Sequence, residues 1–222
     1  MNCWKKIRIS LLATTFGGVL FVLGKSILFP SLSDRIQPSL VFPAAVSLPE
    51  WQPLASSPLV DQIAEPSEYI SGRHYRYIQN GFPLDIEMRY LVKTDGNVRL
   101  YINKYTHIPS SPDQPLPILR QRDGIGFYSL FVHQKRAYLS ACINPRGGST
   151  VTDYQFRRNR YIYDVRLSRF LPWLLGEADL RDVRCLWAHL SVPLNNSSPE
   201  KAYQVLEKTW ISWYKLWSPR FF

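Results

Sequence analysis

The chain has 222 residues, of which 14% are aromatic and 20% charged, and this composition excludes an intrinsically disordered protein. Its formal net charge is +10, but four of the cations, Lys5, Lys6, Arg8 and Lys25, lie within the first 25 residues. The other basic residues are spread along the chain and form no cluster, so the charge does not predict nucleic-acid binding. The length suffices for one domain with a hydrophobic core.

Residues 1–30 have the pattern of a membrane anchor. Three cations precede residues 9–24, which carry no charge, and the apolar run continues past Lys25 to Phe29. A helix that rises about 1.5 Å per residue would cross about 30 Å of hydrocarbon within this run. A cleaved signal peptide is the alternative, although no A-x-A-like site follows. The excess of cations before the run predicts a single-pass membrane protein with a cytoplasmic N-terminus and an extracytoplasmic main domain, on the periplasmic side.

Residues 31–70 are rich in proline and serine. Proline resists helix formation and removes hydrogen-bond donors, so we expect a linker or an extended strap. Within it, the stretch "FPAAVSLPEWQPL" is more apolar than a free linker requires. Trp51 is therefore expected to dock onto the domain that follows.

Residues 71–222 are predicted to form an α+β domain. Residues 73–79 and 84–92 alternate between apolar and polar side chains, and the Asn80-Gly81 pair between them is a hairpin turn signal. Together they indicate antiparallel strands, which the following segments extend into a sheet of six or seven strands. The further strands are expected at 98–105, 126–132, 136–143, 149–156 and 182–194, with a proline-rich loop at 106–120.

Two helices complete the predicted domain. Residues 161–176 repeat apolar side chains at helical spacing. Residues 199–217 begin with Pro199, which suits the first position of a helix, and their aromatic residues recur at three- and four-residue steps. Trp213 and Trp217 therefore either cover the sheet or, with the neighbouring lysines, form a membrane-interface segment.

The stretch "ACINPRGGSTVT", residues 141–152, has three interpretations. Cys142 as a nucleophile, with Arg146 and the amides of Gly147 and Gly148 holding an oxyanion, would define a thiol hydrolase or transferase. None of the four histidines stands in a cysteine-protease context. In the second interpretation Cys142 packs inside a strand and the two glycines form a turn. In the third, Arg146 on this turn binds an acidic partner or a peptide carboxylate.

The two cysteines of the predicted outer domain, Cys142 and Cys185, are either a disulfide or two buried thiols. A metal site that adds His189 lacks any metal-binding spacing. The stretch "DGIGF" at 123–127 lacks the spacing of a nucleotide-binding loop and precedes a strand, so it predicts a turn. We therefore expect no metal and no cofactor.

Several stretches resemble one known family: "LPEWQ", "EMRYLVKTDGNVRLYINKYT", "RAYLSACINPRGGSTVT", "RFLPWLLG", "RCLWAHLSVPLN" and "SWYKLW". With the basic N-terminus, the apolar helix and the proline-rich segment, they resemble the accessory proteins of exosortases, and within them the cyanobacterial branch, the cyanoexosortase A system-associated proteins. Exosortases are membrane peptidases or transpeptidases that process proteins with a C-terminal Pro-Glu-Pro sorting signal. The resemblance covers nearly the whole chain.

The resemblance implies that catalysis belongs to the exosortase, so no functional residue is carried over to this chain. The leading hypothesis is a non-catalytic accessory protein of a protein-sorting system in the cell envelope, which contacts the membrane and the exosortase, its substrates or both. A thiol enzyme that uses Cys142 and an envelope domain that binds glycans or lipids are the alternatives. The candidate partner-binding residues are Arg146, Gly147, Gly148, Trp213 and Trp217.

Overall fold

The computed structural model describes residues 3–28, 40–60, 69–106, 108–109, 117–175, 178–194 and 198–221. The chain divides into two units, Met1–Ile36 with Asp164–Arg181, and Gln37–Tyr163 with Asp182–Phe222. The second unit contains an antiparallel sheet and helices, so the predicted α+β class is confirmed.

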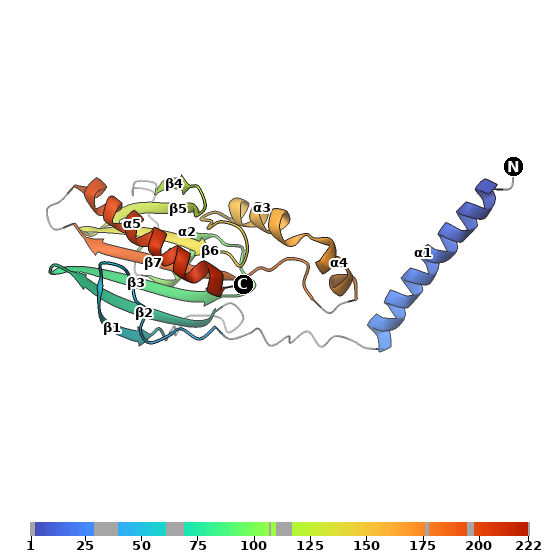
Figure 1. Ribbon diagram of the computed structural model, residues 1–222, viewed down its shortest axis with the longest axis horizontal. Helices are drawn as coiled ribbons and strands as arrows, with labels where there is room; N and C mark the ends of the chain where they lie inside the picture. Colours follow the sequence, from blue (N-terminus) through green and yellow to red (C-terminus); the bar gives the residue numbers. More distant parts are fainter. Residues whose placement is uncertain are drawn as a thin grey trace. The chain divides into compact units, whose positions relative to one another are not determined.

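The domain is built on one sheet of seven strands in the order β1-β2-β3-β7-β6-β5-β4 (Figure 1). Two antiparallel three-stranded groups, β1–β3 and β4–β6, are joined by β7, which pairs antiparallel with β3 and β6. The edge strands are therefore β1 and β4. The strands are β1 (Gln52–Pro58), β2 (Tyr69–Gln79), β3 (Phe82–Leu91), β4 (Ile118–Arg122), β5 (Gly126–His133), β6 (Arg136–Ile143) and β7 (Cys185–Pro193).

Two-residue turns set the register of two hairpins. Asn80 and Gly81, between β2 and β3, have φ of 49° and 79°. Gln134 and Lys135, between β5 and β6, have φ of 46° and 60°. Positive φ at both central residues gives a turn whose twist matches that of the flanking strands. The predicted β2–β3 hairpin is confirmed, and the predicted strands at 126–132 and 136–143 form the second one.

The long helix α5 (Pro199–Trp217) packs across one face of the sheet (Figure 1). Because successive side chains of a strand point to opposite faces, Leu139, Ala141 and Ile143 of β6 meet this helix. The apolar residues of the proline-rich segment complete the same core, and Trp51 docks there as expected. These core residues of α5 and of the segment are Tyr203, Leu206, Trp210, Trp213 and Trp217, and Phe42, Val46, Leu48 and Trp51.

The opposite face carries a smaller core under α2 (Val98–Tyr105). The predicted strand at 98–105 is wrong, because these residues form a helix. An alternating strand would have buried Leu100. The helix instead buries positions 98, 101 and 102, which share one helical face, and leaves Leu100 half exposed.

The predicted strand at 149–156 is also wrong. Thr150 forms an isolated bridge with Cys142, and the chain then enters α3 (Asp153–Asp164). A helical stripe of α3 is buried, but three of its four members are polar or charged, so the stripe does not show as apolar periodicity. The buried residues of α3 are Phe156, Asn159, Arg160 and Asp164.

The predicted helix at 161–176 is two helices in the structure. α3 ends at Asp164, and α4 (Leu167–Leu174) begins after Arg166, whose backbone is extended with φ −130° and ψ 148°. α4 belongs to the smaller unit, and none of its residues is buried.

The two edge strands lie in segments for which no strand was predicted. β1 falls inside the proline-rich segment 31–70, and β4 begins at the end of the predicted loop 106–120. Most residues of both strands are exposed. Strands with little burial lose the alternation on which a prediction from sequence depends.

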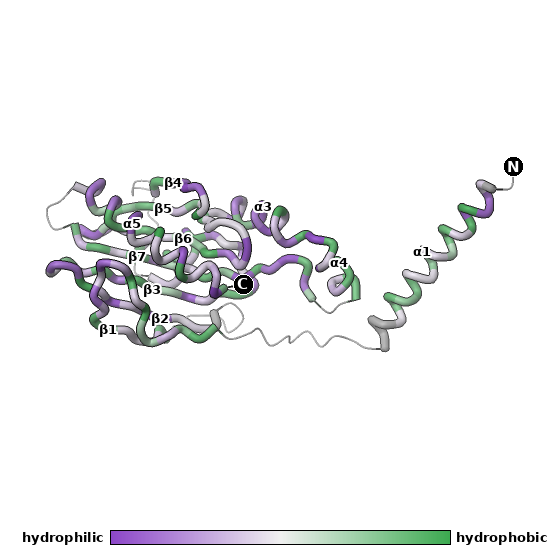
Figure 2. The backbone as a smooth tube through the Cα atoms, viewed as in Figure 1, coloured by the Kyte–Doolittle hydropathy of each residue, from purple (hydrophilic) through white to green (hydrophobic). Residues whose placement is uncertain are grey.

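The N-terminal helix α1 (Cys3–Leu28) contains a stretch, Trp4–Gly24, that is long and apolar enough to cross a membrane. None of this stretch is buried in the structure. Figure 2 shows hydrophobic colouring along much of the helix and hydrophilic colouring near its N-terminal end. Length and composition therefore support a membrane span, and they fit a signal sequence equally well. The orientation stays a prediction.

Candidate functional site: a groove beside the Gly-Gly turn

Cys142 of β6 and Cys185 of β7 are diagonal neighbours, because Ile143 pairs with Leu186 between them. Their sulfur atoms form a disulfide, with the Cα atoms 5.6 Å apart, and both side chains are fully buried. Of the two alternatives for this pair, the structure has the disulfide. A sulfur atom in a disulfide is not the thiolate that a cysteine nucleophile requires.

The stretches "DGIGF" and "RGGST", weighed separately in the sequence, lie together in the structure. The Ser149 amide donates to the Ile125 carbonyl at 2.7 Å, and the Phe127 amide donates to the Ser149 carbonyl at 2.9 Å. Gly126 and Ser149 form an isolated parallel bridge. The Gly-Gly turn is thereby joined, backbone to backbone, to the turn that precedes β5.

This approach requires glycine at two positions. Gly126 has φ of 107°, and a Cβ there would strike the backbone of Ser149. Gly147 has φ of 75°, and a Cβ there would strike Asn159 and Tyr163 of α3. Both positions therefore need a residue that adopts positive φ and has no side chain.

Arg146 turns back toward the domain. Its Nη1 atom lies 3.8 Å from Oδ2 of Asp182, and its carbonyl oxygen accepts hydrogen bonds from Asn159 and Arg160 of α3. Arg184 binds the same aspartate, with 2.6 Å from Nε to Oδ1. Burial raises the pKa of Asp182, but the Arg184 hydrogen bond and the charges of Arg184, Arg160 and Arg146 outweigh burial and lower it. Arg146 therefore fastens the turn to the domain.

A groove of about 760 Å³ opens beside this turn, within the size range of ligand sites. Gly147 and Gly148 line it together with the turn before β5. Strand β4 and helix α3 supply the other surfaces, with Tyr214 of α5. The side chains that matter most here are Leu119, Arg122, Tyr154, Arg158, Ile162 and Tyr163.

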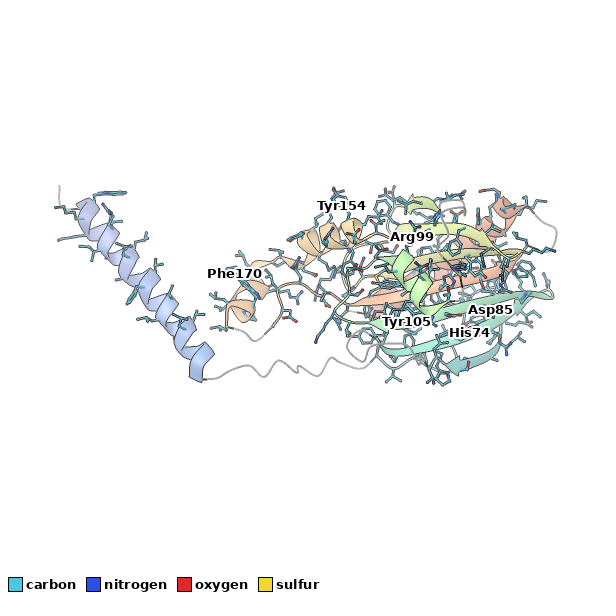
Figure 3. The ribbon with its side chains drawn as sticks, turned by 180° about the vertical axis from the view of Figure 1, so that it is seen from behind. His74, Asp85, Arg99, Tyr105, Tyr154 and Phe170 are labelled. Atoms are coloured by element: carbon cyan, nitrogen blue, oxygen red, sulfur yellow. A yellow bond between two sulfur atoms is a disulfide. The ribbon has the colours of Figure 1, made fainter. Side chains whose placement is uncertain are left out.

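The groove combines exposed apolar groups with a net positive charge, because Arg122 and Arg158 line it together with one carboxylate, that of Asp123. Tyr154 of α3, labelled in Figure 3, is 65% exposed, and Ile162 is 58% exposed. Arg122 and Arg158 are exposed as well. A groove of this composition suits an extended polypeptide segment that carries apolar and acidic side chains.

Side chains on the face of β4 that points toward α5 hold this edge strand in place. Nη1 and Nη2 of Arg120 donate to Glu207 and Glu200 of α5, each with a shortest distance of 3.0 Å. The Tyr128 hydroxyl donates to Glu207 at 2.8 Å. Because side chains alternate along a strand, Leu119 and Gln121 point away from α5 and line the groove.

Trp213 and Trp217 do not belong to this site. Both indoles are buried in the main core, and Trp213 donates a hydrogen bond to the sulfur of Met88 at 3.0 Å. Trp213 also packs edge-on against Tyr75. Of the two interpretations of this helix, the structure has the one in which the tryptophans cover the sheet, so neither ring offers a surface to a partner or to lipid.

A polar network lies on the sheet face opposite α5. His74 Nε2 is 3.1 Å from Asp85, and Arg136 donates to the same carboxylate at 2.6 Å (Figure 3). Burial raises the pKa of Asp85, but the hydrogen bond from His74 and the charge of Arg136 lower it by more, so the net shift is downward. Arg136 also donates to Ser191 at 2.8 Å. The serine bonds to the arginine, so the set forms a charge network and not a nucleophile–base pair.

His189 lies beside this network, stacked on Tyr138 with 5.2 Å between ring centroids. It is almost completely buried, and burial lowers its pKa to about 4, with the charges of Arg89 and Arg136 acting in the same direction and that of Glu87 opposing them. Within the residues that the structure describes, no group of three or more His, Cys, Asp or Glu side chains could hold a metal ion.

Reasoning from sequence did not predict that α3 contributes to this site. Asn159 and Arg160 hold the Gly-Gly turn, and Tyr154 and Arg158 line the groove. The available signal was the helical spacing of Phe156, Asn159 and Arg160. Their mixed polarity hid that signal.

Comparison of the chain with protein-family models, with curated proteins and with solved structures gave no match.

Proposed function

We propose that this chain is a non-catalytic accessory protein of an exosortase-type protein-sorting system. α1 anchors it in the membrane with the N-terminus in the cytoplasm. The sheet domain then lies on the extracytoplasmic side, where it contacts the exosortase, its protein substrates or both. The resemblance of the sequence supports the system, and the disulfide Cys142–Cys185 supports an oxidising compartment.

The observation that carries the contact is the groove beside β4. An edge strand offers unpaired main-chain groups to an extended segment of another protein, and the neighbouring pockets select its side chains. Here Tyr154 and Ile162 offer apolar contacts, while Arg122 and Arg158 offer charge to an acidic segment. The groove therefore replaces Arg146 as the proposed partner-binding surface, because Arg146 already contacts Asp182 within the domain.

The alternatives are less well supported. A thiol enzyme needs a free Cys142, whose sulfur is bonded to Cys185. A glycan- or lipid-binding site on the terminal helix needs exposed indoles, and those of Trp213 and Trp217 are buried. No observation favours a thiol enzyme or a lipid-binding site on the terminal helix.

Co-purification tests the proposal. The tagged full chain is extracted in mild detergent from cells that express the exosortase and a substrate with the sorting signal. The double variant Arg158→Glu/Ile162→Asp alters the groove, and Arg99→Glu/Leu100→Asp makes the same chemical changes on α2. All four positions are exposed, so both variants should fold.

We expect the wild type and the α2 variant to retain the partner and the groove variant to lose at least tenfold, which corresponds to about 1.4 kcal/mol. Equal retention by both variants would remove the groove from the proposal. If the wild type fails to retain either partner and deletion of the gene leaves substrate processing normal, the whole proposal is wrong.

A further inference from the structure

Helix α4 (Leu167–Leu174) presents its apolar face to the outside. Leu167 and Leu171 are 92% and 60% exposed, and Phe170 and Leu174 share their helical face at three- and four-residue spacing. Trp173 flanks this stripe and is also exposed. A surface helix of a globular protein normally turns such a stripe toward the core. In α4 the stripe is the exposed side.

The polar side of α4 is fastened within its own unit. Arg169 lies 3.8 Å from Asp164, with Nη1 facing Oδ1, and its Nη2 donates to the carbonyl oxygen of Asp179 at 3.0 Å. These contacts fix which side of the helix faces inward. Figure 3 labels Phe170, which belongs to the outward stripe. The exposure is thus a feature of the helix and not of one side chain.

We propose that the apolar stripe of α4 lies in the interface of the bilayer that holds α1. Leucines with Phe170 and Trp173 on one side, and Ser168 and Arg169 on the other, form the pattern of a helix that lies in the plane of a membrane interface. Arg166, just before the helix, is exposed and can reach phosphate head groups. The inference rests on the proposed anchoring by α1.

The chain itself keeps α4 near a membrane. Eleven residues, 29–39, separate the end of α1 from Leu40, and at full extension they span at most about 40 Å. A domain of this size has a radius of gyration of only about 16 Å, and α4 begins four residues after Tyr163 of that domain, so the chain allows α4 to reach the bilayer. Contact is therefore intramolecular, and a short helix that would bind lipid weakly on its own is held at high effective concentration.

Depth-dependent quenching in protein-free vesicles tests this inference, because no protein partner is then present. The full chain, with Cys3→Ser, receives one cysteine at a time for an environment-sensitive nitrobenzoxadiazole label. Leu171→Cys reports on α4, Val19→Cys on the anchor, and Leu100→Cys on a comparably exposed leucine of α2. Each labelled chain is reconstituted into phosphatidylcholine/phosphatidylglycerol vesicles with and without brominated acyl chains.

We expect brominated lipid to quench the label at positions 19 and 171 and to leave position 100 unchanged. Leu167→Asp added to Leu171→Cys should abolish quenching at 171 only. Quenching at 19 without quenching at 171 would overturn the inference and leave the anchor intact, and would point to a protein as the occupant of the stripe. No quenching at 19 would overturn the proposed anchoring, and the result at 171 would then decide the role of α4 by itself.

Discussion

Removing the disulfide should destabilise the domain by an amount that depends on the number of residues between the two cysteines. Cys142 and Cys185 are 43 residues apart. A cross-link that closes a loop of this length reduces the entropy of the unfolded chain, and the loop-closure relation gives about 4 kcal/mol at 25 °C. The variant Cys142→Ala/Cys185→Ala removes the link and adds no polar group to a fully buried site. For a chain of this size the loss corresponds to roughly 8–16 °C in the melting temperature.

The assay is urea unfolding of the full chain in detergent, followed by near-ultraviolet circular dichroism. The double variant should lower the unfolding midpoint, and dithiothreitol should do the same to the wild type while leaving the double variant unchanged. Cys3→Ala is the matched control, since Cys3 lies outside the loop. The reasoning is refuted if dithiothreitol does not move the wild-type midpoint and all three cysteines of the unreduced, unfolded chain titrate as free thiols.

Three further predictions use the same unfolding assay. Gly147→Ala should cost several kcal/mol more than Gly124→Ala, because both glycines have positive φ but only at Gly147 would a Cβ meet other atoms; equal costs would contradict the packing of the turn. Trp213→Ala should cost about 3–5 kcal/mol and Trp173→Ala less than about 1 kcal/mol, since only the first indole is buried; the reverse order would contradict the assignment of the core. His189 has a pKa of about 4 in the fold and 6.5 when unperturbed. The unfolded chain therefore binds a proton at His189 more tightly than the folded chain does. The free energy of unfolding should keep its full value above pH 6.5 and fall by up to about 3 kcal/mol as the pH drops to 4. His189→Gln should flatten that part of the profile, and an unchanged slope would show that other groups cause it.

The sheet could be predicted from sequence where local signals suffice. The β2–β3 hairpin has alternation on both strands and Asn80-Gly81 between them, so the register follows from the turn. The segment 98–105 shows where such signals fail. Its apolar residues fit alternation and one helical face equally well, and packing against Trp187 and the rest of the smaller core selects the helix. Secondary structure of this kind is decided by tertiary packing.

The candidate site was less predictable than the sheet. The strand that holds Cys142 and the Gly-Gly turn follow from the sequence, because a short apolar run followed by Asn-Pro and two glycines is a local pattern. The groove depends on long-range contacts that local patterns do not encode. Ser149 bonds to Ile125, and Arg146 faces Asp182. Each contact joins segments at least 24 residues apart in the chain.

The two aromatic helices show how length decides which apolar stripe becomes core. α5 has 19 residues and is about 28 Å long, enough to cross several strands spaced about 4.8 Å apart. Its buried residues run from Ala202 to Trp217, so the stripe meets the sheet along most of the helix. α4 has eight residues, about 12 Å, with Pro172 inside it. A helix this short forms in water only with support from a surface that takes its apolar side, and no residue of α4 is buried within the part of the chain that the structure describes. The membrane contact proposed for α4 has the chemistry considered for the terminal helix, and the quenching of a label at position 171 measures whether lipid supplies that surface.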